Sequence, residues 1–145
     1  MIKILLDTNV VVDNLALREP FAKDAKTIFT MIAKKSIIGY VNTSSITDIY
    51  YIIRKTFNDT DSREKIRTIL NLLQTIEVTK SDCFTALDSP LSDFEDALVA
   101  VCANKEDLDY IVTRDIEFLK LEKAISPGDF LEKFRNLSPL PIGTA

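Results

Sequence analysis

Four aspartates stand where a folded chain could bring their carboxylates together. Asp7 and Asp115 each follow a run of apolar residues, which is the pattern of a buried strand that ends there. Ligands of open α/β sheets bind beside the carboxyl ends of the strands, so both positions are suited to chemistry. Asp48 and Asp96 lie near the beginnings of expected helices. A set of this kind indicates a site for a divalent cation.

Each aspartate also has a purely structural interpretation. Asp7 and Asp115 could each cap a helix that follows. Asp48 comes three residues after Ser45, which is the spacing of a capping box. Asp96 fits such a role less well, because the seven residues after it are all apolar and a buried carboxylate needs a cation or several donors.

Two further acidic residues flank Asp96. Asp93 could itself cap the helix, and Glu95 has capping-box spacing from Ser92. We expect Asp93 and Glu95 to support the site at most, and not to hold the metal.

The absence of histidine from all 145 residues narrows the chemistry. It removes the usual general base, the Ser-His triad and the imidazole metal ligand together. Carboxylates about 4 Å apart repel by about 1 kcal/mol per pair in water and by about 4 kcal/mol at an effective dielectric of 20, and a divalent cation removes that repulsion. Oxygen ligands alone suit Mg²⁺ or Mn²⁺. The composition therefore predicts metal-assisted hydrolysis of a phosphodiester.

Alternating strands and helices must position these residues. Apolar runs predict strands at 2–6, 37–41, 76–78 and 110–113, with a possible edge strand at 124–125. Helical spacing and capping residues predict helices at about 20–35, 43–55, 66–73, 93–103 and 127–134, with a brief helix after Ser81. The expected fold class is α/β, in three α/β/α layers around a central, mainly parallel sheet.

Length and composition indicate one ordinary globular domain. A chain of this size can bury a core without disulfide bonds or a structural metal. Its 46% hydrophobic and 28% charged residues are typical of such domains. We expect a nuclease-type domain over 1–136 and, because prolines and a glycine follow, an extended tail over 137–145.

Several other functions are disfavoured. A net charge of -4 argues against coating of nucleic acid by bulk electrostatics. The three glycines form neither a P-loop nor a GxGxxG turn. Cys83 and Cys102 lack CxxC spacing and are expected to be buried thiols. No export signal or membrane span is visible, so a cytoplasmic protein is expected.

Four stretches resemble the motifs of the PIN domain family: Ile4 to Asn9, Ser45 to Asp48, Asp96 to Leu98, and Thr113 to Asp115. The resemblance implies a PIN fold with a nuclease site that holds Mg²⁺ or Mn²⁺ through Asp7, Asp48, Asp96 and Asp115. It makes Asn9 and Thr113 supporting polar residues. Many small bacterial and archaeal members, the VapC-like toxins, are ribonucleases paired with an antitoxin. Many members have glutamate at the second acidic position, so Asp48 must approach the metal more closely, bind it through water, or act only as a cap.

Basic residues offer candidate contacts to a substrate phosphate. Arg114, beside Asp115, could hold a phosphate bidentately or pair with a neighbouring aspartate. Other basic groups, which are more often solvated helix faces, include Lys34, Lys35, Arg54, Lys55, Arg63, Lys65 and Arg67.

The leading hypothesis is a metal-dependent endoribonuclease that is the toxin of a toxin-antitoxin pair. It would act on RNA, bind a cognate antitoxin protein and, by the resemblance, form a homodimer. The alternative is a catalytically degenerate PIN module that binds RNA or protein. A phosphatase is disfavoured because position 9 is Asn9, which breaks an Asp-x-Asp pattern.

Overall fold

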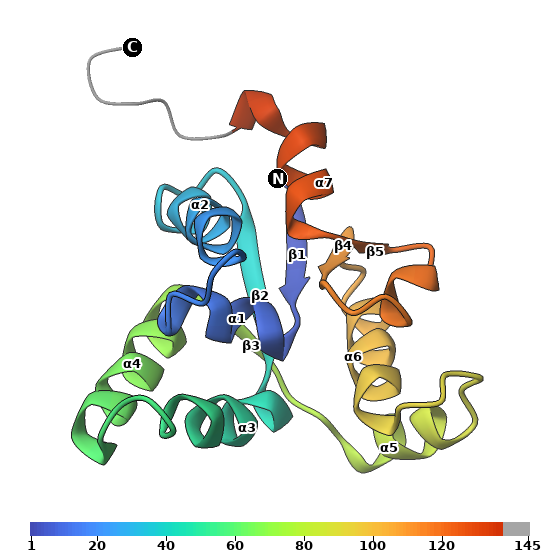
Figure 1. The fold of residues 1–145 in the computed structure, drawn as a ribbon. Coiled ribbons are helices and arrows are strands. Elements are labelled where there is room, and N and C mark those ends of the chain that lie inside the picture. The colour runs from blue at the N-terminus through green and yellow to red at the C-terminus, as the bar shows by residue number, and fades with distance from the viewer. Residues whose placement is uncertain (138–145) are drawn as a thin grey trace.

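The computed structural model describes residues 1–137 and contains one sheet of five strands in the order β3-β2-β1-β4-β5 (Figure 1). Every neighbouring pair of strands is parallel. The strands are β1 (Lys3–Leu6), β2 (Ile38–Asn42), β3 (Gln74–Ile76), β4 (Tyr110–Val112) and β5 (Ala124–Ile125). The predicted parallel sheet is confirmed, although β3 begins two residues before the predicted strand.

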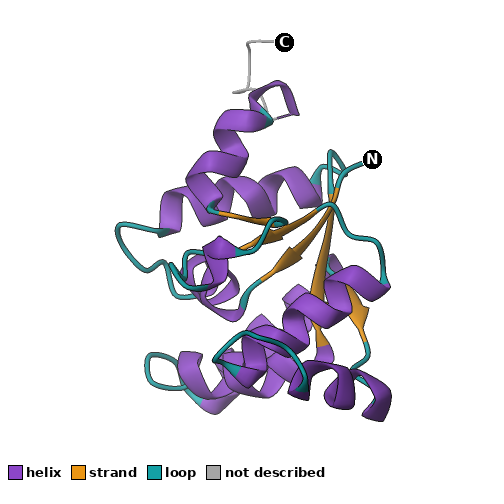
Figure 2. Cartoon of the chain, turned by 90° about the vertical axis from the view of Figure 1, so that its right-hand side faces the viewer, coloured by secondary structure: helices purple, strands orange, loops and turns teal. Residues whose placement is uncertain are grey.

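Seven α-helices surround this sheet within residues 1–137. They are α1 (Thr8–Leu15), α2 (Ala22–Ala33), α3 (Thr43–Ile53), α4 (Asp59–Leu72), α5 (Lys80–Leu87), α6 (Phe94–Lys105) and α7 (Pro127–Lys133), with 3₁₀ turns at Phe118–Lys120 and Arg135–Leu137. The short α5 is capped by Thr79 in a capping box with Asp82, and not by Ser81. Figure 2 shows the strands between helices that lie on both sides.

Helix α1 is the one α-helix in the described chain that the sequence analysis did not predict. It contains three consecutive valines, Val10 to Val12, whose branched side chains lower helix propensity. All three are fully buried, and the Asp7 side chain accepts a hydrogen bond from Thr8 N at the start of the helix. Burial and the cap therefore outweigh local propensity here.

The alternation of side chains along β1 divides the core between the two faces of the sheet. Ile4 and Leu6 belong to the cluster that α1, α2, α3 and α7 cover, whereas Leu5 faces the cluster that includes Val99 and Cys102 of α6. In Figure 1, α1 to α4 lie on one side and α5 and α6 on the other. The predicted three-layer arrangement is confirmed.

The parallel pairing of β1 with β4 determines where polar residues meet. Leu6 is paired with Val112, and Asp7 N donates to Val112 O at 3.0 Å. The residues that follow the two strands, Asp7 and Thr113, therefore emerge side by side at the carboxyl edge of the sheet.

Three other expectations concern the cysteines, membrane spans and the chain end. Cys83 and Cys102 are both free thiols, and Cys102 is buried as predicted, whereas Cys83 is only half-buried. Within residues 1–137, none of the helices combines the length and the apolarity needed to cross a membrane. Apart from Leu137, the predicted extended tail at 137–145 lies outside the described residues.

Gly39 provides a test of core packing. A Cβ atom there would lie 2.5 Å from Ile32 Cδ1 and 2.8 Å from Leu73 Cδ2, so both side chains would have to move. We expect Gly39→Ala to lower the free energy of unfolding by about 1–3 kcal/mol, measured by urea denaturation.

Gly128→Ala is the matched control, because the nearest atom to its new Cβ, Asp24 Oδ2, would be 3.5 Å away. In the first turn of α7 this change should be neutral or stabilise by up to about 1 kcal/mol. Equal effects of the two substitutions would contradict the packing argument.

Candidate active site

A cleft of about 360 Å³ opens at the carboxyl edge of the sheet, between the N-terminal ends of α1 and α6 and the middle of α3. It is lined by Asp7, Thr8, Asn9, Asp48, Tyr51, Ile52, Asp93, Glu95, Asp96 and Asp115. All four predicted aspartates meet here, together with two of the predicted supporting residues, Asn9 and Asp93. The lining contains six carboxylates and, among the described residues, no lysine or arginine.

Asp7 is the most buried of these carboxylates, with 7% of its surface exposed. Its Oδ1 accepts a hydrogen bond from Thr8 N at 2.9 Å, and its Oδ2 accepts one from Thr113 Oγ1 at 2.8 Å. Burial raises the pKa of Asp7, while the hydrogen bonds from Thr113 and Thr8 oppose the rise. Capping α1 and facing the cleft are thus two roles of one side chain.

Thr113 connects Asp7 to Asp115. This threonine is fully buried, and its hydroxyl donates to Asp7 while accepting a hydrogen bond from Asp115 N at 3.1 Å. Asp115 Oδ1 in turn accepts from Glu117 N at 2.9 Å, which turns the chain toward the 3₁₀ helix. The threonine therefore fixes the spacing of two cleft carboxylates without itself lining the cleft.

The start of α6 adds three more carboxylates. Asp93 is the N-cap and accepts a hydrogen bond from Asp96 N at 3.0 Å, which confirms the predicted cap. The pKa of Asp96 is raised to about 7, first by burial and then by the charges of Asp93, Asp7 and Asp115. The first turn of α6 therefore presents acidic side chains that the cleft holds against repulsion.

Glu95 lines the cleft, whereas the sequence analysis assigned it at most a supporting role. Burial raises its pKa to about 7, and a hydrogen bond to Asp48, together with the like charge of Asp48, adds to the rise. The sequence analysis explained Glu95 by its capping-box spacing from Ser92, whereas the N-cap is Asp93 and no capping box forms. The signal that could have identified it is its direct adjacency to Asp96 in a first turn.

Asp48 is not a capping residue. Helix α3 already begins at Thr43, so Asp48 lies in the body of the helix and the capping-box interpretation with Ser45 fails. Its exposed side chain lines the cleft beside Glu95. This location leaves a role in the cleft as the interpretation that the geometry favours.

Arg114 does not line the cleft. Its guanidinium donates from Nε and Nη2 to the two carboxylate oxygens of Asp13, at 2.8 and 3.2 Å. Of the two interpretations of Arg114, the structure shows the pairing with an aspartate.

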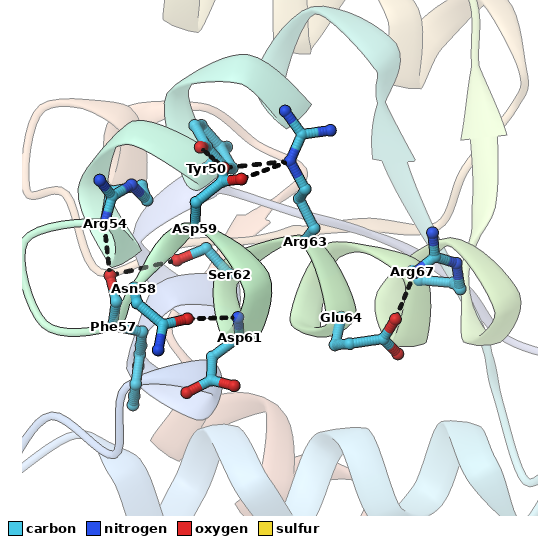
Figure 3. Close-up of polar contacts among 10 residues, drawn as sticks. All are labelled: Tyr50, Arg54, Phe57, Asn58, Asp59, Asp61, Ser62, Arg63, Glu64 and Arg67. Atoms are coloured by element: carbon cyan, nitrogen blue, oxygen red, sulfur yellow. Dashed lines mark hydrogen bonds and ion pairs between the residues drawn. The ribbon is translucent and has the colours of Figure 1, made fainter.

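The basic residues at the junction of α3 and α4, here called the α3–α4 corner, also contact side chains close to them in sequence (Figure 3). Arg63 Nε donates to Asp59, which the Tyr50 hydroxyl also contacts, and Arg67 pairs with Glu64. The ammonium group of Lys65 lies 4.4 Å from the centre of the Phe57 ring. These contacts fit the interpretation of the corner as a solvated helix surface.

The chemistry of the donor set fits a hard divalent cation. The described lining holds six carboxylates and no lysine or arginine, and Thr8 Oγ1, in another lining residue, is buried without a hydrogen-bond partner. As placed, however, no three acidic side chains within residues 1–137 form a ready-made ligand set around one point. Ligation would require the carboxylates to draw closer together.

Comparison with known proteins identifies the class. The PIN domain family model matches residues 3–117, and the chain therefore belongs to the PIN domain family. The resemblance found in the four motifs is confirmed.

Individual relatives agree with this assignment. Ribonuclease VapC1 of Aquifex aeolicus (strain VF5) is 26% identical over 141 residues, which cover 93% of this chain and 97% of that protein. A toxin-antitoxin complex from Klebsiella pneumoniae matches 86% of this chain and 97% of its own with a TM-score of 0.65 and 17% identity. VapC20 of Mycobacterium tuberculosis, a toxin that cleaves the sarcin-ricin loop, matches 81% of this chain and 93% of its own with a TM-score of 0.65 and 13% identity. The two structural matches show a shared fold.

The raised pKa values predict how stability depends on pH. A carboxyl group whose pKa is higher in the folded than in the unfolded state stabilises the fold while it is protonated. This contribution is lost as the pH rises from the pKa of the unfolded state to the pKa of the folded state. For Asp96 and Glu95 this window runs from 3.8 and 4.5 respectively to about 7. We expect the metal-free protein to melt at a lower temperature at pH 8 than at pH 5.

Asp96→Asn should reduce the difference in melting temperature between pH 5 and pH 8. It should raise the melting temperature at pH 8 by about 2 °C or more, because it removes a partly buried charge that also lies near other carboxylates. Mn²⁺ should raise the melting temperature of the wild type more at pH 8 than at pH 5. Thermal melts with Asp129→Asn, an exposed α7 variant, provide the control. The same pH dependence in wild type and Asp96→Asn would contradict the raised pKa of Asp96.

Proposed function

We propose that this protein is an endoribonuclease that hydrolyses RNA phosphodiester bonds with Mg²⁺ or Mn²⁺. The observation that carries the proposal is the cleft of six carboxylates at the strand ends of a PIN domain without histidine. Similarity to Ribonuclease VapC1 over 93% of the chain supports the choice of RNA. Hydrolysis on carboxylates alone needs a cation to bring water and phosphate together.

The proposed ligands are Asp7, Asp96, Asp115 and Asp48, held directly or through water. Asp7 and Asp115 are the best oriented, because Thr113 contacts both. Asp96 faces them from the first turn of α6, and Asp48 from α3 across the cleft. Glu95 joins this set through its contact with Asp48, and Asn9 and Asp93 support it from the same lining.

The chain itself would contribute to catalysis by holding the metal ligands and the substrate in position. When bound, the cation supplies a Lewis acid that activates the attacking water and offsets charge on the phosphate. Hydrogen bonds from Thr8 and Thr113 hold the two oxygens of Asp7 in fixed directions. Tyr51 and Ile52 form the wall of the cleft beside the carboxylates, where a nucleotide of the substrate would lie.

We also propose that the protein is the toxin of a toxin-antitoxin pair. The fold is shared with a toxin-antitoxin complex from Klebsiella pneumoniae and with the VapC20 toxin. Its partners would be an RNA substrate and a cognate antitoxin protein, and a homodimer is the expected assembly. A toxin that cleaves cellular RNA would act in the cytoplasm.

The nuclease proposal is tested by cleavage of RNA with purified protein freed of any antitoxin. We expect cleavage with Mg²⁺ or Mn²⁺ and none with chelator. Asp7→Asn should lower the rate by at least about 100-fold, since the loss of groups that merely support a metal ligand already costs about 10–100-fold. Asp129→Asn should cleave as the wild type does.

A degenerate PIN module that binds RNA or protein without cleaving is the second candidate. It is favoured by the absence, within residues 1–137, of three acidic side chains already grouped around one point. RNA binding that survives chelation, with no cleavage under any metal and no effect of Asp7→Asn, would establish it and would refute the nuclease.

A further inference from the structure

Asp13 is a buried carboxylate that lies outside the cleft. It is on α1, its side chain is 1% exposed, and it has two arginine partners. Arg114 contacts both of its oxygens, and Arg18 Nε approaches Oδ1 at 3.3 Å. A carboxylate so deeply buried requires such partners, and these two come from separate parts of the chain.

The guanidinium of Arg114 is held from its edge and from its face. The edge makes the bidentate contact with Asp13, and the face lies 3.9 Å from the centre of the Phe21 ring. A planar guanidinium fixed in both ways has a defined orientation that an ammonium group would not have. Arg114 is therefore an anchor for the backbone that carries it.

That backbone segment carries the cleft residues. Arg114 stands between Thr113 and Asp115 in the segment that follows β4. Thr113 contacts Asp7 and Asp115 lines the cleft, whereas Arg114 contacts Asp13 and does not line the cleft. The chain after β4 is thus attached to α1 at two points.

The two attachment points lie well apart on α1. Asp7 is at the N-terminus of the helix, and Asp13 follows six residues later, which is about 9 Å along the axis at about 1.5 Å per residue. A single contact would leave the segment able to rotate about it, whereas two separated contacts also fix its direction.

We infer that Asp13 and Arg114 form a positioning pair that holds Asp115 in place relative to Asp7. The inference rests on the proposed function, since it assigns the pair to the metal site. Neither residue touches metal or substrate. Their role is to keep two carboxylates from different strands at a distance that one cation can bridge.

The test compares Arg114→Met and Arg114→Lys with the wild type. Arg114→Met should weaken Mn²⁺ binding about 10-fold in calorimetric titration, the scale at which groups that orient metal ligands act. In the metal-free protein it should also speed hydrogen exchange at the amides of Asp115, Glu117 and Leu119. Arg114→Lys keeps the charge and loses the bidentate contact, so its Mn²⁺ affinity and exchange rates should lie between those of the wild type and Arg114→Met. This variant remains informative if Arg114→Met does not fold.

Lys105→Met is the matched control. Lys105 Nζ lies 2.6 Å from Asp82 Oδ2, another largely buried carboxylate, at the far end of α6 from Asp96. This variant also removes a cationic partner from a buried carboxylate and should lower the melting temperature. Its Mn²⁺ affinity and its exchange at residues 115–119 should match the wild type.

Three outcomes decide the inference. Wild-type Mn²⁺ affinity and exchange in Arg114→Met would overturn it, whatever the loss of stability. Weakened RNA binding with unchanged Mn²⁺ affinity and exchange would also overturn it, by making Arg114 a phosphate contact. If the wild type binds no Mn²⁺, the proposed function fails, and the exchange comparison alone then decides whether the pair holds the segment.

Discussion

The site depends on like charges that the parallel sheet forces together. Pairing of Leu6 with Val112 brings the ends of β1 and β4 to one edge, so that Asp7 and Asp115 must lie near each other. The N-terminus of α6 then adds Asp93, Glu95 and Asp96 to the same cleft. No basic side chain among the described residues lines it, so the repulsion remains unless a cation offsets it. The pKa values of Asp7, Glu95 and Asp96 are raised, first by burial and then by these neighbouring charges.

The surrounding structure opposes this repulsion with directed contacts. The N-terminus of α1 gives Asp7 a backbone donor, and the buried Thr113 hydroxyl supplies another. The apolar faces of β1 are covered on one side by α1 and α2 and on the other by α6. The hydrophobic core thus holds together carboxylates that would otherwise move apart.

The sequence predicted the parts of the site that depend on strand ends. Buried apolar runs before Asp7 and Asp115 are local signals, and parallel topology converts them into proximity. Helix α1 was missed because consecutive valines have low helix propensity, and burial of all three decides the outcome. Glu95 was undervalued and Asp48 was left between two roles because Ser92 and Ser45 were candidate caps. The observed N-caps are Asp93 and Asn42, one and three residues away.

Charge distribution also bears on how an acidic protein would engage RNA. Within residues 1–137, Arg63, Arg67 and Arg114 each have a carboxylate partner, so their charges are partly offset where they lie. With a net charge of -4 and an acidic cleft, the chain has little bulk attraction for a polyanion. Under the proposed function, the attraction for a phosphate at the cleft would come largely from the bound cation. Substrate binding and metal binding would be coupled in such a protein, because the same carboxylates that repel RNA in the metal-free state retain the ion that attracts it.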